Sequence, residues 1–458
     1  MRGTFHSWRD GTKGRSDEVF GPRAESTLKI GDRVMYSDGN GDVRTYRGIY
    51  AQRERTSDFI DSGDFLEHPE DVRFLGAKNI NGVATYALEI HPPQGQAQRL
   101  YIDRTTYLID RLEYESGDGL ETVDYSDYRE VQGQLFAYTG VASNGDHDFD
   151  VTEKTTDVAL GKSIAPGVFR EPHQRFIDVE GTVEVPLIER AEHWYATVTL
   201  GAKPYQFLID TGSQNIVIDS RVAREQHLKE AGALEVAGVT RAGGLKLTRV
   251  PELAIGSAKL HDLIAATIDL GSSTQGIFHI DGILGYPFFA GAVVRIDPIA
   301  KTMTLARPER ASIAGAKVDI DMDRGFPEVN AVVDASVRAP FVLDTGNGSE
   351  LLLYRPFVDA HAGIVKFTLD GHTTYGVGGS TQAYRTMLGS IEFGGFTFFN
   401  RWTNVMLGKR GAFADRFDAG NIGLPILRNF VVTFDVYNSA MYLERADGFD
   451  DGRDRQSR

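Results

Sequence analysis

Two aspartates draw attention because each follows an apolar run and begins the same tripeptide. Residues 207–213 (FLIDTGS) return 134 positions later as residues 341–347 (FVLDTGN). At this composition about 0.3 Asp-Thr-Gly triplets are expected by chance, so two copies in matching surroundings indicate a function. Two adjacent carboxyls cannot both ionise easily, so they share one proton. We expect Asp210 and Asp344 to act together, one as a base toward a water molecule and the other as a donor to a carbonyl.

Other landmarks return in the same order, which indicates an internal repeat. They are Gly243 and Gly244, which return as Gly378 and Gly379, and residues 281–287 (DGILGYP), which return as residues 419–425 (AGNIGLP). The offset between copies changes by only four residues over this series. We therefore expect two copies of one β-rich lobe: lobe 1 at residues 190–310 and lobe 2 at residues 326–445.

The residues after each aspartate fit a sharp turn packed against a second copy of itself. Gly212 and Gly346 permit the turn and a close approach of the backbones. Thr211 and Thr345 carry hydroxyls that can donate to backbone across a two-fold axis and clamp the two turns together. A pseudo-two-fold axis between the lobes would place the two aspartates side by side.

These motifs resemble those of the aspartic peptidases over residues 190–445. The resemblance implies a bilobal all-β fold, a substrate cleft between the lobes, and peptide-bond hydrolysis by a water that the aspartate pair holds, without metal, cofactor or covalent intermediate. It implies a catalytic pair, Asp210 and Asp344, supported by Thr211, Gly212, Ser213, Thr345, Gly346 and Asn347. We expect an aspartic endopeptidase whose partner is a polypeptide substrate.

The lobes are short, which is closer to the retroviral type than to pepsin. Asp210 lies 75 residues before Gly285, and Asp344 lies 79 residues before Gly423. Retroviral-type enzymes cover the cleft with two flaps, one per subunit. The candidate flap and substrate-binding residues are Gly243, Gly244, Tyr375, Gly378 and Gly379. The chain resembles two retropepsin-like units in tandem, and we expect a monomer because one chain supplies both aspartates.

Two positions depart from the family pattern. Ser213 follows the first triplet as in pepsins, where its hydroxyl can bond the outer carboxylate oxygen, but Asn347 follows the second. This difference leaves the pH optimum open. Asn421 stands in the strand expected beneath Asp344, where an apolar residue is usual.

Residues 1–140 alternate short β-type segments with turn residues. Residues 38–42 (DGNGD) between two such segments predict a hairpin. The pattern favours an antiparallel meander, curled around a helix, and residues 100–114 resemble the half-barrel, lipoprotein-carrier-like domains of bacterial envelopes. The resemblance implies a periplasmic or secreted protein whose signal segment is absent from this chain. Residues 141–189 are expected to be a linker or crossing segment, and residues 446–458 a polar tail that frays.

Composition removes several classes of function. The net charge of −15 argues against a nucleic-acid partner, which needs a basic face. The lack of cysteine excludes thiol catalysis and Cys-ligated metal. No apolar run reaches the roughly 18 residues of a spanning helix, and no His-Glu-x-x-His pair suggests zinc. The fold class expected is all-β, mainly antiparallel, in three parts.

The sequence leaves a second class of function open. The same duplicated lobes could form a non-catalytic envelope protein that binds a peptide in the cleft or a lipid in the N-terminal domain. The Gly-Gly segments could likewise be ordinary hairpin tips. Asp146, Asp148 and Asp150 are spaced like calcium ligands, but Val151 stands where an EF-hand loop needs glycine, so solvated loop charge is the favoured interpretation.

Overall fold

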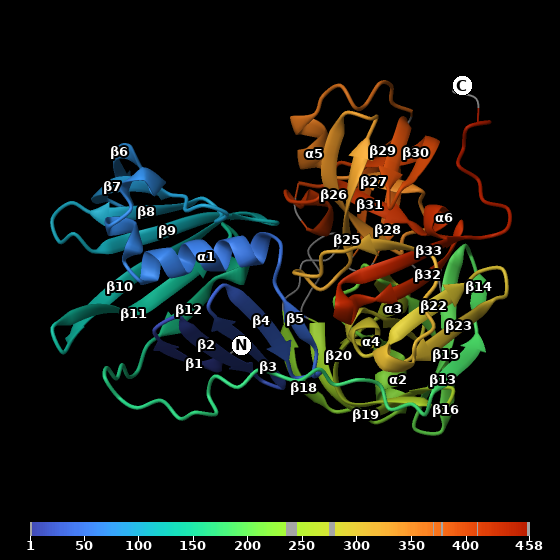
Figure 1. The fold of residues 1–458 in the computed structure, drawn as a ribbon, viewed down its shortest axis with the longest axis horizontal. Coiled ribbons are helices and arrows are strands. Elements are labelled where there is room, and N and C mark those ends of the chain that lie inside the picture. The colour runs from blue at the N-terminus through green and yellow to red at the C-terminus, as the bar shows by residue number, and fades with distance from the viewer. Residues whose placement is uncertain are drawn as a thin grey trace.

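The computed structural model describes residues 2–234, 245–273, 280–369, 371–376, 379–409 and 411–455. It confirms an all-β chain with mainly antiparallel sheets. The N-terminal region lies beside the two lobes, with lobe 2 above lobe 1 in the view of Figure 1. Every helix among the described residues is too short or too polar to cross a bilayer. The helices are α1 (Ile49–Asp61), α2 (Ser220–Glu225), α3 (Leu270–Ser273), α4 (Tyr286–Ala290), α5 (Arg355–Ala360) and α6 (Leu424–Leu427).

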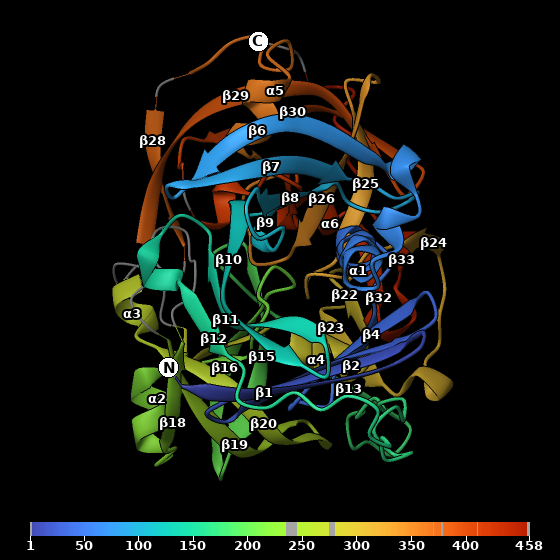
Figure 2. The same ribbon diagram turned by 90° about the vertical axis from the view of Figure 1, so that its left-hand side faces the viewer.

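The N-terminal region is an antiparallel meander in two sheets. Pairing of Tyr36 with Arg44 confirms the hairpin predicted around residues 38–42. α1 lies on the concave side of the second sheet (Figure 2), where Ile60 packs with Ile90 and Leu100. The first sheet has the order β1 (Gly3–Asp10), β2 (Lys13–Phe20), β3 (Arg23–Ile30), β4 (Arg33–Asp38), β5 (Val43–Thr45). The second has the order β12 (Val151–Lys154), β11 (Gln134–Ser143), β10 (Gly119–Val131), β9 (Ile109–Ser116), β8 (Gln98–Asp103), β7 (Val83–Ile90), β6 (Val72–Ile80).

The two lobes have main sheets with corresponding strand order. In each lobe, the strand that leads to the aspartate pairs in parallel with a short strand from the repeated segment at residues 281–287 or 419–425. Lobe 1 has the order β14 (Ile188–Arg190), β15 (His193–Leu200), β16 (Lys203–Ile209), β21 (Gly282–Leu284), β17 (Val217–Asp219), β20 (Ala258–Ile268), β19 (Leu245–Ile255), β18 (Glu230–Leu234). Lobe 2 has the order β25 (Glu328–Val333), β26 (Val337–Asp344), β31 (Gly420–Gly423), β27 (Leu351–Leu353), β30 (Phe396–Met406), β29 (Gly379–Phe393), β28 (Gly371–Gly376).

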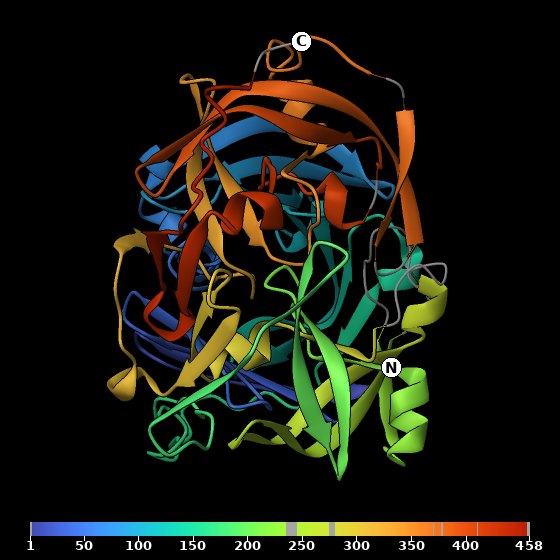
Figure 3. The same ribbon diagram turned by 90° about the vertical axis from the view of Figure 1, so that its right-hand side faces the viewer.

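A six-stranded sheet joins the lobes on the side away from the N-terminal region. This side faces the viewer in Figure 3. Its central pair, β22 with β32, comes from different lobes, with Val294 opposite Phe434. Both residues are fully buried, so the lobes share one apolar core. The order is β13 (Thr182–Pro186), β23 (Thr302–Ala306), β22 (Val293–Asp297), β32 (Phe430–Asp435), β33 (Ala440–Arg445), β24 (Ala316–Asp319).

The described part of the C-terminal stretch, residues 446–455, which was expected to fray, makes contacts with lobe 2. The ring of Phe449 lies 5.4 Å from that of Phe430, and the Phe399 N–H donates to Asp451. Arg455 pairs with Glu350. One aromatic contact, one backbone hydrogen bond and one ion pair thus hold this largely polar stretch against lobe 2.

Candidate active site

The two aspartates end equivalent strands and face one another. Asp210 directly follows β16, and Asp344 is the last residue of β26. A Cβ added at Gly212 would lie 2.6 Å from Cγ of Asp344, and a Cβ at Gly346 would collide with Asp210 in the same way. Glycine is therefore required at both positions by the close approach of the opposite carboxyl, not by an unusual backbone angle.

The two threonines cross-link the turns. The Thr211 hydroxyl donates to the Leu343 carbonyl at 2.6 Å, and the Thr345 hydroxyl donates to the Ile209 carbonyl at 2.8 Å. Each hydroxyl also accepts from the backbone N–H of the opposite threonine at 3.0 Å. Both threonines are buried. These four hydrogen bonds fix the distance between the aspartates.

The carboxyls lie in a site that favours a shared proton. Oδ1 of Asp210 accepts from the Gly212 N–H at 2.9 Å, and Oδ1 of Asp344 accepts from the Gly346 N–H at 3.0 Å. Burial raises the pKa of Asp210 well above its usual value, and the charge of Asp344 raises it further. Burial also raises the pKa of Asp344, although hydrogen bonds from Asn421 and Asp210 oppose that shift. The pair can therefore hold one proton and one charge.

Asn421 contacts the catalytic candidate of its lobe directly. Its Nδ2 donates to Oδ2 of Asp344, and its Oδ1 accepts from the hydroxyl of Tyr354. Asn421 and Tyr354 are each 4% exposed. The sequence marked Asn421 as a departure but gave no signal for Tyr354, since no local pattern connects the two.

Ser213 and Asn347 shape the turns through local hydrogen bonds. The Ser213 hydroxyl donates to the Asn215 carbonyl at 2.9 Å instead of reaching the carboxylate of Asp210. Oδ1 of Asn347 accepts from the Ser349 N–H at 2.8 Å. The different residues after the two triplets thus have similar structural roles.

A cavity of about 1320 Å³ opens onto both aspartates. Its lobe 1 wall is apolar and includes Leu208, Val217 and Ile283. Its lobe 2 wall is more polar and includes Tyr354, Asp415, Asp418 and Asn421. A third wall comes from the N-terminal region and includes Tyr36, Arg44, Tyr46 and Tyr50. No motif of the N-terminal sequence indicated this third wall.

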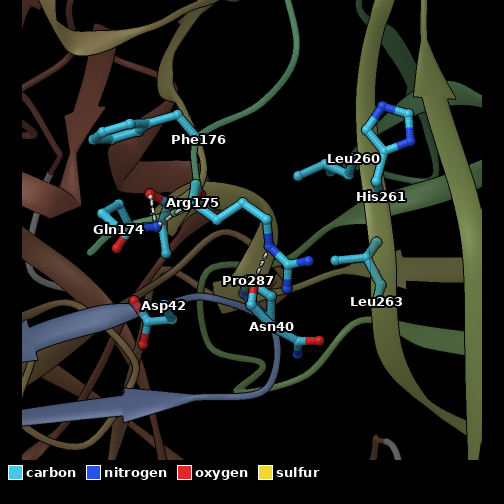
Figure 4. Close-up of a pocket in the computed structure, with 10 residues that line it drawn as sticks. Asn40, Asp42, Gln174, Arg175, Phe176, Leu260, His261, Leu263 and Pro287 are labelled. Atoms are coloured by element: carbon cyan, nitrogen blue, oxygen red, sulfur yellow. Dashed lines mark hydrogen bonds between the residues drawn. The ribbon is translucent and has the colours of Figure 1, made fainter. Parts of the chain in front are cut away.

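The turn at residues 38–42 docks on lobe 1. Asn40 pairs with Ile264 of β20 through two hydrogen bonds, and Arg175 donates to the Asn40 carbonyl at 3.0 Å. Figure 4 shows Arg175 extended toward Asn40 beside Gln174 and Pro287. The space left between these residues is about 30 Å³, which is enough for no more than a few water molecules. The junction is therefore closely packed.

A second junction joins the N-terminal region to the segment between the lobes. The carboxylate of Asp323 accepts from the backbone N–H groups of Arg47, Gly48 and Tyr50, at 2.7, 2.8 and 3.1 Å, where α1 begins. Burial raises the pKa of Asp323 to about 6, and Asp321 adds to the shift. A carboxylate at this position satisfies donors that a helix leaves unpaired.

Two further hydrogen bonds hold the turns that follow the aspartates, and the first comes from the segment between the lobes. Gln214 donates from Nε2 to the Arg324 carbonyl at 2.6 Å. His193, at the start of β15, lies 3.1 Å through Nε2 from the Gly346 carbonyl. Neither residue was singled out from the sequence, because a lone Gln or His carries no spacing signal.

The candidate flap residues lie only partly within the described structure. Gly243, Gly244 and Gly378 fall outside the described residues. β28 and β29 form a hairpin whose last pair is Gly376 with Gly379. Tyr375 lies in β28, and its neighbours Thr374 and Gly376 line the cavity that holds the aspartates. In lobe 1, Leu245 and Leu247 of β19 line the same cavity.

Comparison with known proteins agrees with an aspartic protease-like region. Residues 196–288 match the family model described as aspartyl protease. A search of curated proteins finds no match. Among solved structures, a retropepsin-like aspartic protease from Rickettsia conorii is 17% identical, covering 27% of this chain and 90% of its own, with a TM-score of 0.20. A domain described as an outer membrane lipoprotein-sorting protein from Vibrio parahaemolyticus is 16% identical, covering 34% of this chain and 80% of its own, with a TM-score of 0.20. The stretch that contains the first Asp-Thr-Gly triplet is thus similar to aspartyl proteases.

Proposed function

We propose that the protein is an aspartic endopeptidase that hydrolyses peptide bonds with a water molecule activated by Asp210 and Asp344. The observation that supports this most is the approach of the two carboxyls at the ends of equivalent strands, fixed by the threonine clamp. A pair so placed shares a proton and can supply a base and an acid in one step.

The chemistry follows from that shared proton. The ionised carboxylate takes a proton from the water as the water oxygen bonds to the carbonyl carbon, while the protonated carboxyl donates to the carbonyl oxygen. When the tetrahedral diol collapses, the C–N bond breaks, the nitrogen receives the proton held by the pair, and one hydroxyl of the diol gives its proton back to the pair as the new carboxyl group forms. The pair returns to its single-proton state, and no covalent enzyme intermediate or metal is required.

The cavity supports a substrate with different groups on its two sides. The apolar lobe 1 wall fits an apolar side chain, because burying one contributes about 1.5–3 kcal/mol. The lobe 2 wall presents Asp415 and Tyr354.

We further propose that the lobes at residues 190–310 and 326–445 are copies of one unit. A chain that completes the aspartate pair by itself acts as a monomer, and the N-terminal domain controls entry to the cavity.

The test is peptidase activity from pH 3 to 8 on an unfolded protein and on a fluorogenic peptide with apolar residues at its centre. Cleavage should be blocked by pepstatin and unaffected by EDTA. Asp210→Asn and Asp344→Asn should each reduce kcat at least 1,000-fold while circular dichroism stays unchanged. Asp319→Asn is the matched control, because that side chain is 87% exposed on β24.

Two results would contradict the proposal. Cleavage that persists in either aspartate variant and remains sensitive to pepstatin would remove the pair from the mechanism. Pepstatin binding without cleavage of any peptide would instead favour a non-catalytic peptide-binding protein of the bacterial envelope.

A further inference from the structure

The two lobes differ at one position directly beside the aspartates. In lobe 1, Ile283 of β21 pairs in register with Leu208 of β16. In lobe 2, the equivalent pair is Asn421 of β31 with Val342 of β26. Both residues are buried and both line the cavity. One aspartate therefore has an aliphatic neighbour where the other has an amide.

The orientation of the Asn421 amide follows from its two partners. Burial raises the pKa of Tyr354, and the nearby carboxylates of Asp418 and Asp344 add to the shift, so its hydroxyl stays protonated. That hydroxyl donates to Oδ1 of Asn421, which leaves Nδ2 to face Oδ2 of Asp344. An amide N–H can only donate, so the oxygen that it meets must be an acceptor.

We propose that Asn421, held by Tyr354, is a positioning residue that assigns the shared proton: Asp344 carries the charge and Asp210 carries the proton. Asp344 then accepts from Gly346 on one oxygen and from Asn421 on the other. Among the described residues, Asp210 accepts from backbone donors, chiefly Gly212, and has an aliphatic residue at the equivalent position. The catalytic consequence rests on the proposed function: Asp344 is the base toward water, and Asp210 donates to the carbonyl oxygen.

The catalytic test is the pH profile of kcat/KM for Asn421→Leu, which keeps the branched arrangement of side-chain heavy atoms but cannot donate a hydrogen bond. The Asn421 N–H stabilises the Asp344 carboxylate both when the pair carries one charge and when it carries two. That stabilisation is lost when both carboxyls are protonated. The variant should therefore move the acidic limb up by about one pH unit and leave the alkaline limb in place. Tyr354→Phe should move the same limb in the same direction by a smaller amount. Ile283→Val, at the equivalent position of lobe 1, changes the substrate wall and therefore the height of the profile, but it should move neither limb.

A second test uses thermal unfolding at pH 7 and requires no activity. Asp210→Asn can accept from Gly212 and donate to Asp344, so it mimics a protonated Asp210 and should raise Tm. Asp344→Asn has one oxygen for two donors, Gly346 and Asn421, so it should lower Tm. The two variants should differ by about 3 °C or more, and the difference should fall by at least half in an Asn421→Leu background.

The two tests separate this proposal from the proposed function. If no peptide is cleaved, the peptidase proposal fails, while the Tm difference still decides where the proton lies. Equal Tm values for the two aspartate variants, or an acidic limb that stays in place in both Asn421→Leu and Tyr354→Phe, would overturn the assignment. If Asn421→Leu does not fold, the pH profile of Tyr354→Phe and the Tm values of the two single aspartate variants still test which aspartate carries the proton.

Discussion

The hydroxyl of Tyr286 donates a 2.7 Å hydrogen bond to the carboxylate of Asp42, 244 residues earlier in the chain. The backbone N–H of Tyr286 donates to the Ser213 carbonyl at 2.8 Å. One residue of α4 thus contacts both the N-terminal region and the turn that follows Asp210. The guanidinium of Arg44 lies 4.9 Å from the centre of the Tyr286 ring and completes this contact.

Removing that hydroxyl should destabilise the junction in a pH-dependent way. Burial raises the pKa of Asp42 to about 7, with Arg44 opposing and Asp38 adding to the shift. In Tyr286→Phe the ionised carboxylate loses a donor, so the free energy of unfolding should fall by about 1–3 kcal/mol at pH 8. The loss should be smaller at pH 5, where Asp42 is protonated. Urea unfolding at both pH values measures it, with exposed Tyr107→Phe as control; equal losses would contradict the assignment.

The threonine clamp should be sensitive to loss of the hydroxyl rather than of the methyl group. Thr211→Val leaves the Leu343 carbonyl and the Thr345 N–H without their partner. We expect about 2–4 kcal/mol of lost stability and at least a tenfold lower kcat. Thr211→Ser keeps the hydroxyl and should cost about 1 kcal/mol. Thr197→Val, on the exposed side of β15, is the matched control. Similar losses for Val and Ser would disprove the role of the hydroxyl.

The raised pKa of Asp210 predicts how stability changes with pH. The folded chain keeps a proton that the unfolded chain releases above about pH 4, so the parent loses stability as pH rises from 4 toward 7. Asp210→Asn lacks this titration. The Tm of the variant minus that of the parent should therefore be near zero at pH 4 and increase at each step to pH 7. A constant difference across this range would show that Asp210 is not protonated in the folded protein.

The C-terminal stretch should contribute to the stability of lobe 2. Phe449 is half-buried against Phe398 and Phe430. Phe449→Ala should lower the free energy of unfolding by about 2 kcal/mol, since part of a ring leaves the core. Leu66→Ala, at a position 75% exposed, is the control and should change little. Deletion from residue 446 should also lower Tm.

Features that depend only on neighbouring residues could be predicted from the sequence. The apolar run, aspartate and glycine of each turn occur together in the chain, because strand burial and turn geometry are local requirements. The hairpin at residues 38–42 was predicted for the same reason. Each of these depends on neighbours within a few positions.

Features that depend on distant partners could not be predicted. α1 begins at Ile49 after Gly48, which offers no side-chain cap, and its first N–H groups are satisfied by Asp323, more than 270 residues away. Asn421 was recognised as unusual, but its hydrogen bonds to Asp344 and Tyr354 exist only once three separate strand ends meet. The N-terminal wall of the cavity has no sequence signature, because it depends on docking.

Different residues can stand at the equivalent positions 283 and 421 only because one chain contains both lobes. In an assembly of two identical subunits, every substitution beside one aspartate is repeated beside the other, so the two environments change together. Here each position is encoded separately, and a substitution in one lobe has no counterpart in the other. Natural variation can therefore alter the surroundings of the two aspartates one at a time, a freedom that a symmetric dimer lacks.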